Sequence, residues 1–323
     1  MIEVRNLSRQ YGALKAVDRV SFDIQRREIV GLLGHNGAGK TTIMKMLTGF
    51  LEPSRGTIRI AGHDIAAQGD DGRRAVQRRI GYLPENCPLY PDMTVLDHLD
   101  YQAALHGIDG GARHRAIRRA VERTALEAKA TALVATLSRG YRQRLGVAQA
   151  ILHEPDILIL DEPTNGLDPS QILHMRGLIR ELAGAATVII STHILQEVEA
   201  ICERVLIMRA GRLALDSRLG ELAGAPRLLI TLDQAEGAAR EALGAVEGVT
   251  GFEPLAASDG QPAERHSYAL GSADVSALAP RIARLINDKG WSLYRLEPER
   301  HDLEALFKAV SSQEVSKPEV THG

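Results

Sequence analysis

The sequence has little of several features that would define its class. Of its 323 residues only two are cysteine and only 4% are aromatic, and its 39 basic residues nearly balance its 41 acidic ones. Two isolated cysteines, Cys87 and Cys202, exclude a disulfide scaffold and a cysteine-based metal site, so we expect reduced thiols. The balanced charge argues against nucleic acid as a partner, because nucleic-acid binders usually carry a strong basic excess.

Long hydrophobic runs are also missing. The strongest apolar stretches, residues 157–160 and 188–190, have the length of a strand, whereas a membrane-spanning helix needs about 18 apolar residues or more. The first residues, Met-Ile-Glu-Val-Arg, lack the apolar core of a secretory signal. We therefore expect a cytoplasmic protein that does not span a membrane by itself.

What is present indicates a globular protein of about two domains, since a typical domain has roughly 150 residues. Gly, Ala and Pro cluster over residues 220–226, where we place the boundary. This predicts a first domain over 1–222, an accessory domain over 226–310 and a disordered tail over 311–323.

The first domain shows the pattern of an α/β protein. Strand-like runs at 157–160 and 187–191 enclose a helical stretch, as in parallel βαβ units. Residues 73–135 are predicted to be mainly helical, with Thr94 and Asp97 as a capping box and with Gly107 and Gly110-Gly111 separating two segments. Shorter strand-like runs occupy 2–4, 20–24 and 57–60, around a central apolar run at 29–33.

The accessory domain alternates strands and helices in the order of a split βαβ, ferredoxin-like α+β fold. A short amphipathic helix is predicted after it, at 303–310. The expected strands are 228–232, 250–254, 267–270 and 292–296, and the expected helices are 238–243 and 275–287.

A phosphate-binding loop follows the central apolar run. Gly34-His35-Asn36-Gly37-Ala38-Gly39-Lys40-Thr41 matches G-x-x-x-x-G-K-[ST] between a strand and a helical run. Glycines let backbone N–H groups curve around phosphate oxygens, and the helix N-terminus favours anions. Lys40 is predicted to reach the β and γ phosphates, Thr41 to hold Mg²⁺ and Thr42 to contact the α phosphate.

Two acids, Asp161 and Glu162, end the strand-like run at 157–160. By themselves they could merely cap the next turn. After a phosphate loop, however, Asp161 is suited to hold Mg²⁺ and Glu162 to deprotonate the attacking water.

Between the loop and the acids lies Leu137-Ser138-Arg139-Gly140-Tyr141-Arg142-Gln143-Arg144. It resembles the signature segment of ATP-binding-cassette (ABC) ATPases. Further motifs of that family follow its order: Tyr11, Glu85 in Gly-Tyr-Leu-Pro-Glu, Asn165-Gly166-Leu167-Asp168, and His193 after Val-Ile-Ile-Ser-Thr. The resemblance implies a P-loop NTPase cassette with a mixed sheet core, an antiparallel β subdomain and a helical subdomain at about 86–150.

The resemblance also implies roles for these residues. Tyr11 stacks on adenine, Glu85 helps to coordinate Mg²⁺ and His193 contacts the γ-phosphate. Ser138, Arg139, Gly140 and Tyr141 bind the nucleotide of an opposing subunit, and Asp168 contacts that subunit, so the active form is a homodimer around two ATP molecules with Mg²⁺. Taken singly, Ser138 and Asp168 could be ordinary helix caps, and His193 a core residue.

Two features depart from the commonest family pattern. Glu85 stands where glutamine is usual, and Arg139 and Tyr141 replace a glycine and the glutamine of the signature. In this form the motifs are similar to cassettes of ABC-2 type exporters and gliding-associated transporters. That similarity implies polytopic membrane permease subunits as partners, and a peripheral position on the cytoplasmic side of the inner membrane.

Two functions other than powering export by ATP hydrolysis stay open from the sequence. A DNA-repair or translation ABC ATPase usually has a long coiled-coil insertion or a second cassette, and this sequence has neither. A cassette could also act as an ATP-gated dimerisation switch. ATPase activity measured with and without a membrane partner distinguishes that switch from a pump.

Overall fold

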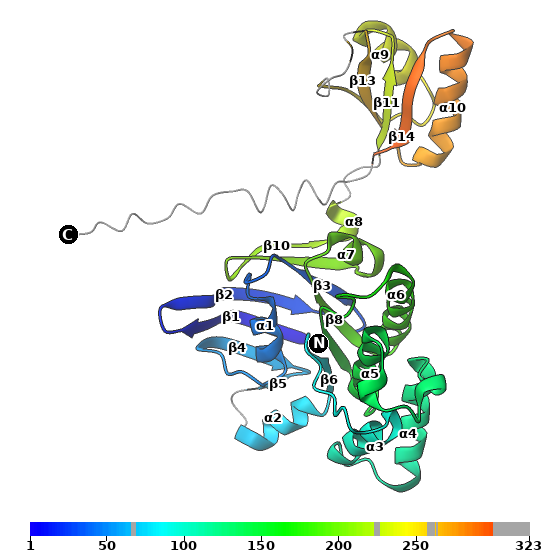
Figure 1. Cartoon of the computed structure of the whole chain (residues 1–323). Helices are drawn as coiled ribbons and strands as arrows, with labels where there is room; N and C mark the ends of the chain where they lie inside the picture. Colours follow the sequence, from blue (N-terminus) through cyan, green and yellow to red (C-terminus); the bar gives the residue numbers. More distant parts are fainter. Residues whose placement is uncertain (66–68, 223–226, 257–261, 263, 300–323) are drawn as a thin grey trace, which may run out of the picture. The chain divides into compact units, whose positions relative to one another are not determined.

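A computed structural model describes residues 1–65, 69–222, 227–256, 262 and 264–299. Within these residues the chain forms two units, one from Met1–Leu219 and one that begins at Gly220 (Figure 1). Each unit has its own hydrophobic core.

The larger sheet of the first unit is mixed. Its strand order is β10-β9-β3-β8-β7-β6, in which only β10 runs antiparallel to its neighbour. The predicted runs at 29–33, 157–160 and 187–191 are confirmed as strands. The bounds are β3 Ile29–Leu33, β6 Ile80–Leu83, β7 Ile157–Asp161, β8 Thr187–Thr192, β9 Arg204–Arg209 and β10 Arg212–Arg218.

Strand β7 shows why its run at 157–160 is continuously apolar. Ile157 and Ile159 pack into one core cluster, and Leu158 and Leu160 pack into another on the opposite face. All five residues of β7 are buried. A parallel strand covered on both faces has no solvent side on which polar residues could alternate, so the first polar group, Asp161, comes where the strand ends.

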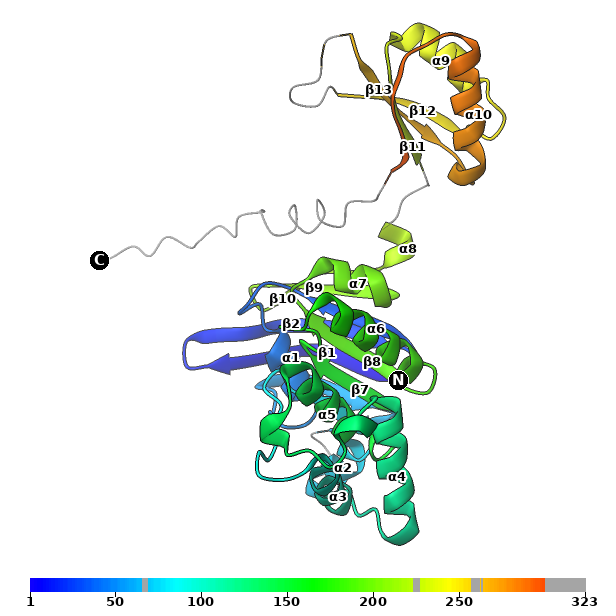
Figure 2. The same ribbon diagram turned by 45° about the vertical axis from the view of Figure 1, so that its right-hand side comes forward.

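The smaller sheet is antiparallel, with the order β2-β1-β4-β5. Helix α1 (Lys40–Leu47) packs between the two sheets, because its buried residues Ile43 and Met44 share a core cluster with strands of both (Figure 2). The phosphate loop that precedes α1 is therefore held from two sides. The bounds are β1 Ile2–Tyr11, β2 Leu14–Ile24, β4 Arg55–Ile60 and β5 His63–Asp64.

Helices α3, α4 and α5 pack on one another as a helical subdomain (Figures 1 and 2). The predicted capping box is confirmed, since Thr94 Oγ1 accepts the Asp97 N–H at 3.1 Å and the Asp97 carboxylate accepts the Thr94 N–H. Gly107, with φ 71°, lies in the break between α3 and α4. The helices are α2 Gly69–Gln77, α3 Val95–Leu105, α4 Gly110–Arg123, α5 Arg139–Ile151, α6 Pro169–Ala183, α7 Leu195–Ile201 and α8 Leu219–Leu222, with 3₁₀ turns at Glu127–Lys129 and Val134–Thr136.

The expectation of a mainly helical stretch over 73–135 is wrong at β6. These four residues extend the mixed sheet by pairing in parallel with β7, from Ile80 opposite Ile157 onward. Gly81 is needed there, because a Cβ would lie 2.2 Å from the Ala150 carbonyl oxygen of α5. The strands β9 and β10 were also not predicted.

The second unit has the predicted ferredoxin-like topology. Its antiparallel sheet has the order β12-β13-β11-β14, and α9 and α10 supply core residues such as Leu243 and Ile282. The bounds are β11 Arg227–Leu232, α9 Glu236–Gly244, β12 Gly251–Leu255, β13 His266–Gly271, α10 Val275–Asp288 and β14 Leu293–Pro298. The helix predicted at 303–310 and the tail at 311–323 lie outside the described residues.

Cys87 and Cys202 are free, and burial raises the pKa of both thiols to about 12, so both are uncharged near neutral pH. Among the described residues, no helix has the length and apolar character needed to cross a membrane.

Two histidines of the first unit form a stacked pair. The rings of His106 and His153 lie 4.0 Å apart and are nearly parallel. His153 Nε2 is 3.1 Å from the Ile80 carbonyl, so we assign its proton to that nitrogen; Nδ1 is buried without a partner in the described part of the chain. Burial, and to a lesser extent His106, lower the pKa of His153 to about 4.

This pair predicts a pH-dependent stability. Below the ordinary pKa of 6.5 the unfolded chain binds a proton at His153, which the folded chain does not bind until about pH 4. The free energy of unfolding therefore falls as the pH decreases through this window. Because partial exposure screens the charge, we expect His153→Gln to lose about 2 kcal/mol less than the wild type between pH 7 and pH 4.5. Urea unfolding measures the difference, and equal losses in the two proteins would contradict the prediction.

Candidate active site

The phosphate loop joins β3 to α1 and depends on glycines with positive φ. Gly37 and Gly39 have φ 81° and 104°, and a Cβ on Gly39 would also lie 2.6 Å from the Ala16 carbonyl oxygen. Lys40, the first residue of α1, turns back over the loop, where its Nζ donates to the Gly34 carbonyl at 2.7 Å and to the His35 carbonyl at 3.3 Å. The loop thus holds a buried ammonium group at the start of a helix.

Asp161 is completely buried at the end of β7. Its Oδ1 accepts the Ser191 hydroxyl, whereas its Oδ2 is buried and has no hydrogen-bond partner among the described residues. A buried carboxylate oxygen without a partner is costly, so a cation or a bound water is expected there.

Glu162 follows with φ 50°, a left-handed conformation that is uncommon outside glycine. The Ser191 carbonyl accepts its N–H at 3.1 Å, which ties the turn after β7 to the neighbouring strand β8. Backbone strain of this kind is often found where a side chain must point into a site.

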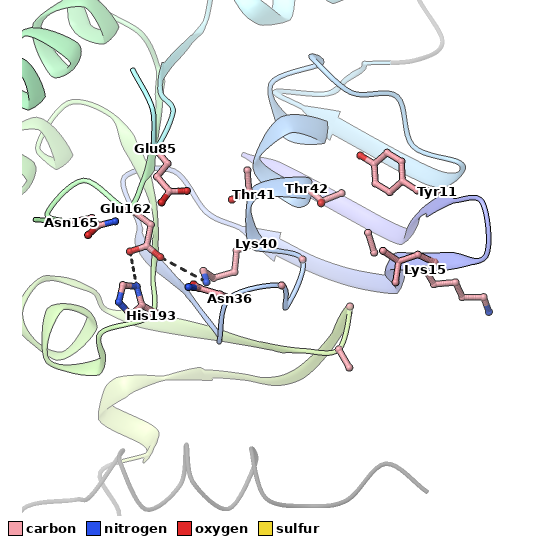
Figure 3. A pocket seen from close by; sticks show the side chains of 16 residues that line it. Tyr11, Lys15, Asn36, Lys40, Thr41, Thr42, Glu85, Glu162, Asn165 and His193 are labelled. Carbon is pink, nitrogen blue, oxygen red and sulfur yellow. Dashed lines mark hydrogen bonds and ion pairs between the residues drawn. The ribbon is translucent and has the colours of Figure 1, made fainter. Parts of the chain in front are cut away.

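The Glu162 carboxylate lies between a lysine and a histidine. Its Oε2 is 2.9 Å from His193 Nδ1, and its Oε1 is 3.8 Å from Lys40 Nζ (Figure 3). Burial lowers the pKa of Lys40, while the charges of Glu162, Asp161 and Glu85 oppose that shift. Glu162 and His193 directly follow β7 and β8, and Lys40 follows the loop after β3. These three strands are neighbours in the sheet, so the parallel topology brings the three side chains together.

A cavity of about 680 Å³ opens in front of these groups. Figure 3 shows Glu85, Glu162, Asn165 and His193 at one end of it and Tyr11 at the other. Tyr11 is 45% exposed, so its ring is accessible, and the Arg9 guanidinium lies 4.7 Å from the ring centre. The lining residues are Tyr11, Leu14, Lys15, Ala16, Asn36, Gly37, Gly39, Lys40, Thr41, Thr42, Glu85, Glu162, Asn165, His193, Ala210 and Gly211.

The predicted signature residues are not among those that line this cavity. Ser138 is the N-cap of α5, where its Oγ accepts the Tyr141 N–H at 3.4 Å. The Arg139 guanidinium packs on Gly166, since a Cβ on Gly166 would lie 2.4 Å from the Arg139 Cζ. Gly140 likewise packs against the side chain of Gln171. The signature helix and the Asn165-to-Asp168 segment of one chain are therefore in contact.

Asp168 is also outside the cavity lining. It is the N-cap of α6, and its Oδ1 accepts the Gln171 N–H at 2.9 Å. The hydrogen bond from the Gln171 N–H has the largest effect in lowering the pKa of Asp168, and a hydrogen bond from the Ser170 hydroxyl lowers it further. Of the other predicted loop residues, Gly34, His35 and Ala38 lie in the loop itself without lining the cavity.

Sequence reasoning missed five residues of the lining, Leu14, Lys15, Ala16, Ala210 and Gly211. Ala210 and Gly211 form the two-residue turn between β9 and β10, with φ 45° and 78°, and the Gly211 N–H donates to the Ala38 carbonyl at 3.1 Å. Glycine in a two-residue turn between strands was the available signal for this hairpin. Nothing in the sequence placed it beside the phosphate loop.

Comparison with known proteins adds to this geometry. A family model described as "ABC transporter" matches residues 17–165. The Nod factor export ATP-binding protein I of Burkholderia lata is 38% identical over 230 residues, which are 71% of this chain and 72% of that protein. The chain belongs to the ABC transporter family.

Other ABC transporter proteins match over a similar share. The bacitracin transport ATP-binding protein BcrA of Bacillus licheniformis is 40% identical over 215 residues, 66% of this chain and 68% of that protein. A solved ATP-binding subunit of an ABC transporter is 33% identical, has a TM-score of 0.62 and matches 69% of this chain and 92% of its own. The predicted cassette fold is therefore confirmed. As an ABC ATP-binding subunit, the chain binds and hydrolyses ATP to power transport through separate permease subunits.

Proposed function

We propose that two copies of this chain close around two ATP molecules, and that hydrolysis reopens them to drive export through ABC-2 type permease subunits. The observation that carries the proposal is the separation within one chain. Lys40, Glu162 and His193 face the cavity, whereas the signature at Ser138–Tyr141 is not part of its lining. A helix N-terminus that can bind phosphate but lies outside the chain's own cavity supports a role toward a second copy.

Binding of the nucleotide is assigned to the loop and to Tyr11. Backbone N–H groups of residues 34–39 surround the phosphates, Lys40 reaches the β and γ phosphates, and Thr42 reaches the α phosphate. The exposed ring of Tyr11 stacks on adenine, while Arg9 covers part of the same ring.

Mg²⁺ is suited to the oxygen ligands at the other end of the cavity. Thr41 and Glu85 line the cavity, and their hydroxyl and carboxylate are hard oxygen donors of the kind that Mg²⁺ prefers. Asp161 is buried and does not line the cavity, but its unpartnered Oδ2 is a third donor of this kind, one residue before Glu162. When bound, the ion would neutralise charge on the phosphates. Glu85 is exposed and adds a negative charge where glutamine is usual in the family.

We assign the hydrolysis step to Glu162 and His193. Glu162 accepts the proton of the attacking water, and His193 holds the γ-phosphate while its Nδ1 fixes the orientation of Glu162. Asp168 and the signature residues Ser138, Arg139, Gly140 and Tyr141 complete the site of the opposing copy.

Export is supported by what the relatives are named for. One is a Nod factor export protein and another a bacitracin transport protein, and both are ATP-binding proteins. We propose that this chain likewise sits at the cytoplasmic face of the inner membrane as a peripheral subunit. The proposed division is a cassette over 1–222 and an accessory domain over 226–310 that regulates or stabilises the dimer.

A membrane partner is the direct test of the transport assignment. Affinity purification of the tagged full chain from detergent-solubilised membranes should recover a polytopic permease of the ABC-2 type. An ATPase that purifies without a membrane protein, with a rate unchanged by membrane extract, would favour the dimerisation switch instead.

The dock for the permease is predicted near residues 82–100. Tyr90, Leu96 and Tyr101 are 38–46% exposed there, and the rings of Tyr90 and Tyr101 meet edge to face at 5.5 Å. We expect Leu96→Glu to lower transport at least about 10-fold with ATP binding unchanged, because a charge opposes burial of this surface. Leu293→Glu, at a matched exposure of 39% in the second unit, is the control. Full transport activity of Leu96→Glu would place the dock elsewhere.

A further inference from the structure

A buried acid stands behind His193. Glu197, in the first turn of α7, is only 2% exposed. Its Oε2 accepts the Thr192 hydroxyl at 3.0 Å, and its Oε1 is buried without a partner among the described residues. Burial of a carboxylate with so few hydrogen bonds is costly, so its presence calls for an explanation beyond packing.

The Thr192 hydroxyl connects this acid to the backbone on the far side of His193. Thr192 Oγ1 accepts the Ile194 N–H at 3.0 Å, two residues along the chain. A hydroxyl has one proton to donate. Because the hydroxyl donates its one hydrogen bond to Glu197, only its lone pairs are left to face the Ile194 N–H. Glu197 therefore fixes the orientation in which Thr192 closes the turn.

His193 is the middle residue of this closed turn. On one side Thr192 is 1% exposed and pairs with Leu33 in the parallel ladder between β3 and β8, so it moves only with the sheet. On the other side the hydrogen bond from Ile194 sets the path into α7. The imidazole between them reaches Glu162 at 2.9 Å (Figure 3). A loose turn would let the ring leave that position while the sheet stayed intact.

We propose that Thr192 and Glu197 are positioning residues that hold His193 against Glu162 through the hydrogen-bond series Ile194 N–H to Thr192 Oγ to Glu197. The proposal rests on the role given to His193 under the proposed function. Neither residue lines the nucleotide cavity, so their effect is on the geometry of catalysis and not on nucleotide contact.

Strand β8 supplies a matched control at its other end. Thr187 is also 1% exposed, and its hydroxyl accepts the Arg27 N–H at 2.9 Å, far from the cavity lining. We expect Thr192→Val to lower kcat about 10-fold with KM for ATP within about twofold, since small misplacements of catalytic groups are expensive. Thr192→Ser, which keeps the hydroxyl, should restore kcat to within about twofold. Thr187→Val should lose similar thermal stability and keep kcat.

A second pair of variants keeps the proposal testable if Thr192→Val does not fold. Glu197→Gln can still accept the Thr192 hydroxyl and should keep kcat within about threefold, whereas Glu197→Leu should match the loss of Thr192→Val. Steady-state ATPase of the full chain measures all of them. Equal kcat in Thr192→Val and Thr187→Val, or equal loss in Glu197→Gln and Glu197→Leu, overturns the proposal. His193→Ala is measured alongside, because an active His193→Ala would instead overturn the role given to His193.

Discussion

Replacing Glu162 by glutamine should lower kcat for ATP hydrolysis at least about 100-fold while ATP affinity changes less than about threefold. A general base typically contributes a factor of 10² to 10⁴. Glutamine keeps the shape of Glu162, and its amide oxygen can still meet Lys40 or His193, but it cannot take a proton from water. Phosphate release measures the rate, and titration with a fluorescent ATP analogue measures the affinity.

The glutamine variant should also accumulate as a dimer when ATP is added, because the bound nucleotide is not consumed. Size-exclusion chromatography with ATP and with ADP tests this. Glu154→Gln is the matched control, since Glu154 is an exposed acid that pairs with Arg119 and does not line the cavity. Hydrolysis at the wild-type rate in the Glu162 variant would remove Glu162 from its proposed role.

The parts of the fold that could be predicted are those whose signal is local. Apolar runs predicted β3 and β7 and the centre of β8, because a strand covered on both faces has no solvent side on which polar residues would alternate. The capping box at Thr94 gave the start of α3, because it uses only residues within one turn of helix.

The missed strands depend on distant partners. Strand β6 has only four residues and follows α2 after two, so nothing local separates it from the helix. It is a strand because β7, more than 70 residues later, offers it a parallel edge. Strand β10 is an edge strand whose residues alternate between exposed and half-buried, which leaves it without an apolar run.

The residues of the site also fall into those with a local sequence signal and those that depend on distant contacts. Lys40 could be named because it belongs to the phosphate-loop motif, and Glu162 and His193 because each directly follows a recognisable strand. Parallel strands bring their carboxyl ends together, which predicts that these groups meet. The contact of Thr192 with Glu197 could not be named, because it depends on the rotamer of a buried acid inside a short helix. The packing of Arg139 on Gly166 could not either, since it joins two segments only in the folded chain.

Lys40→Met should weaken ATP binding at least about 100-fold, which corresponds to about 2.7 kcal/mol. Hydrogen bonds to charged groups each contribute about 1.5–3 kcal/mol, and the side chain of Lys40 is only 6% exposed, so little water competes for its ammonium group. Methionine keeps the length and apolar character of the stem and removes only the charge and its donors. Calorimetric titration with ATP measures the affinity.

The same change distinguishes phosphate binding from a purely structural role of Lys40. In the folded chain Lys40 Nζ already donates to the Gly34 and His35 carbonyls, so its loss should also loosen the loop. If that were its whole function, a loop that still folds would bind ATP almost normally. Lys45→Met, on the same helix but outside the cavity lining, should change the affinity less than about twofold. Equal affinities in the two variants would leave Lys40 as a support of the loop, and ATP binding would then have to rest on backbone N–H groups and Tyr11 alone.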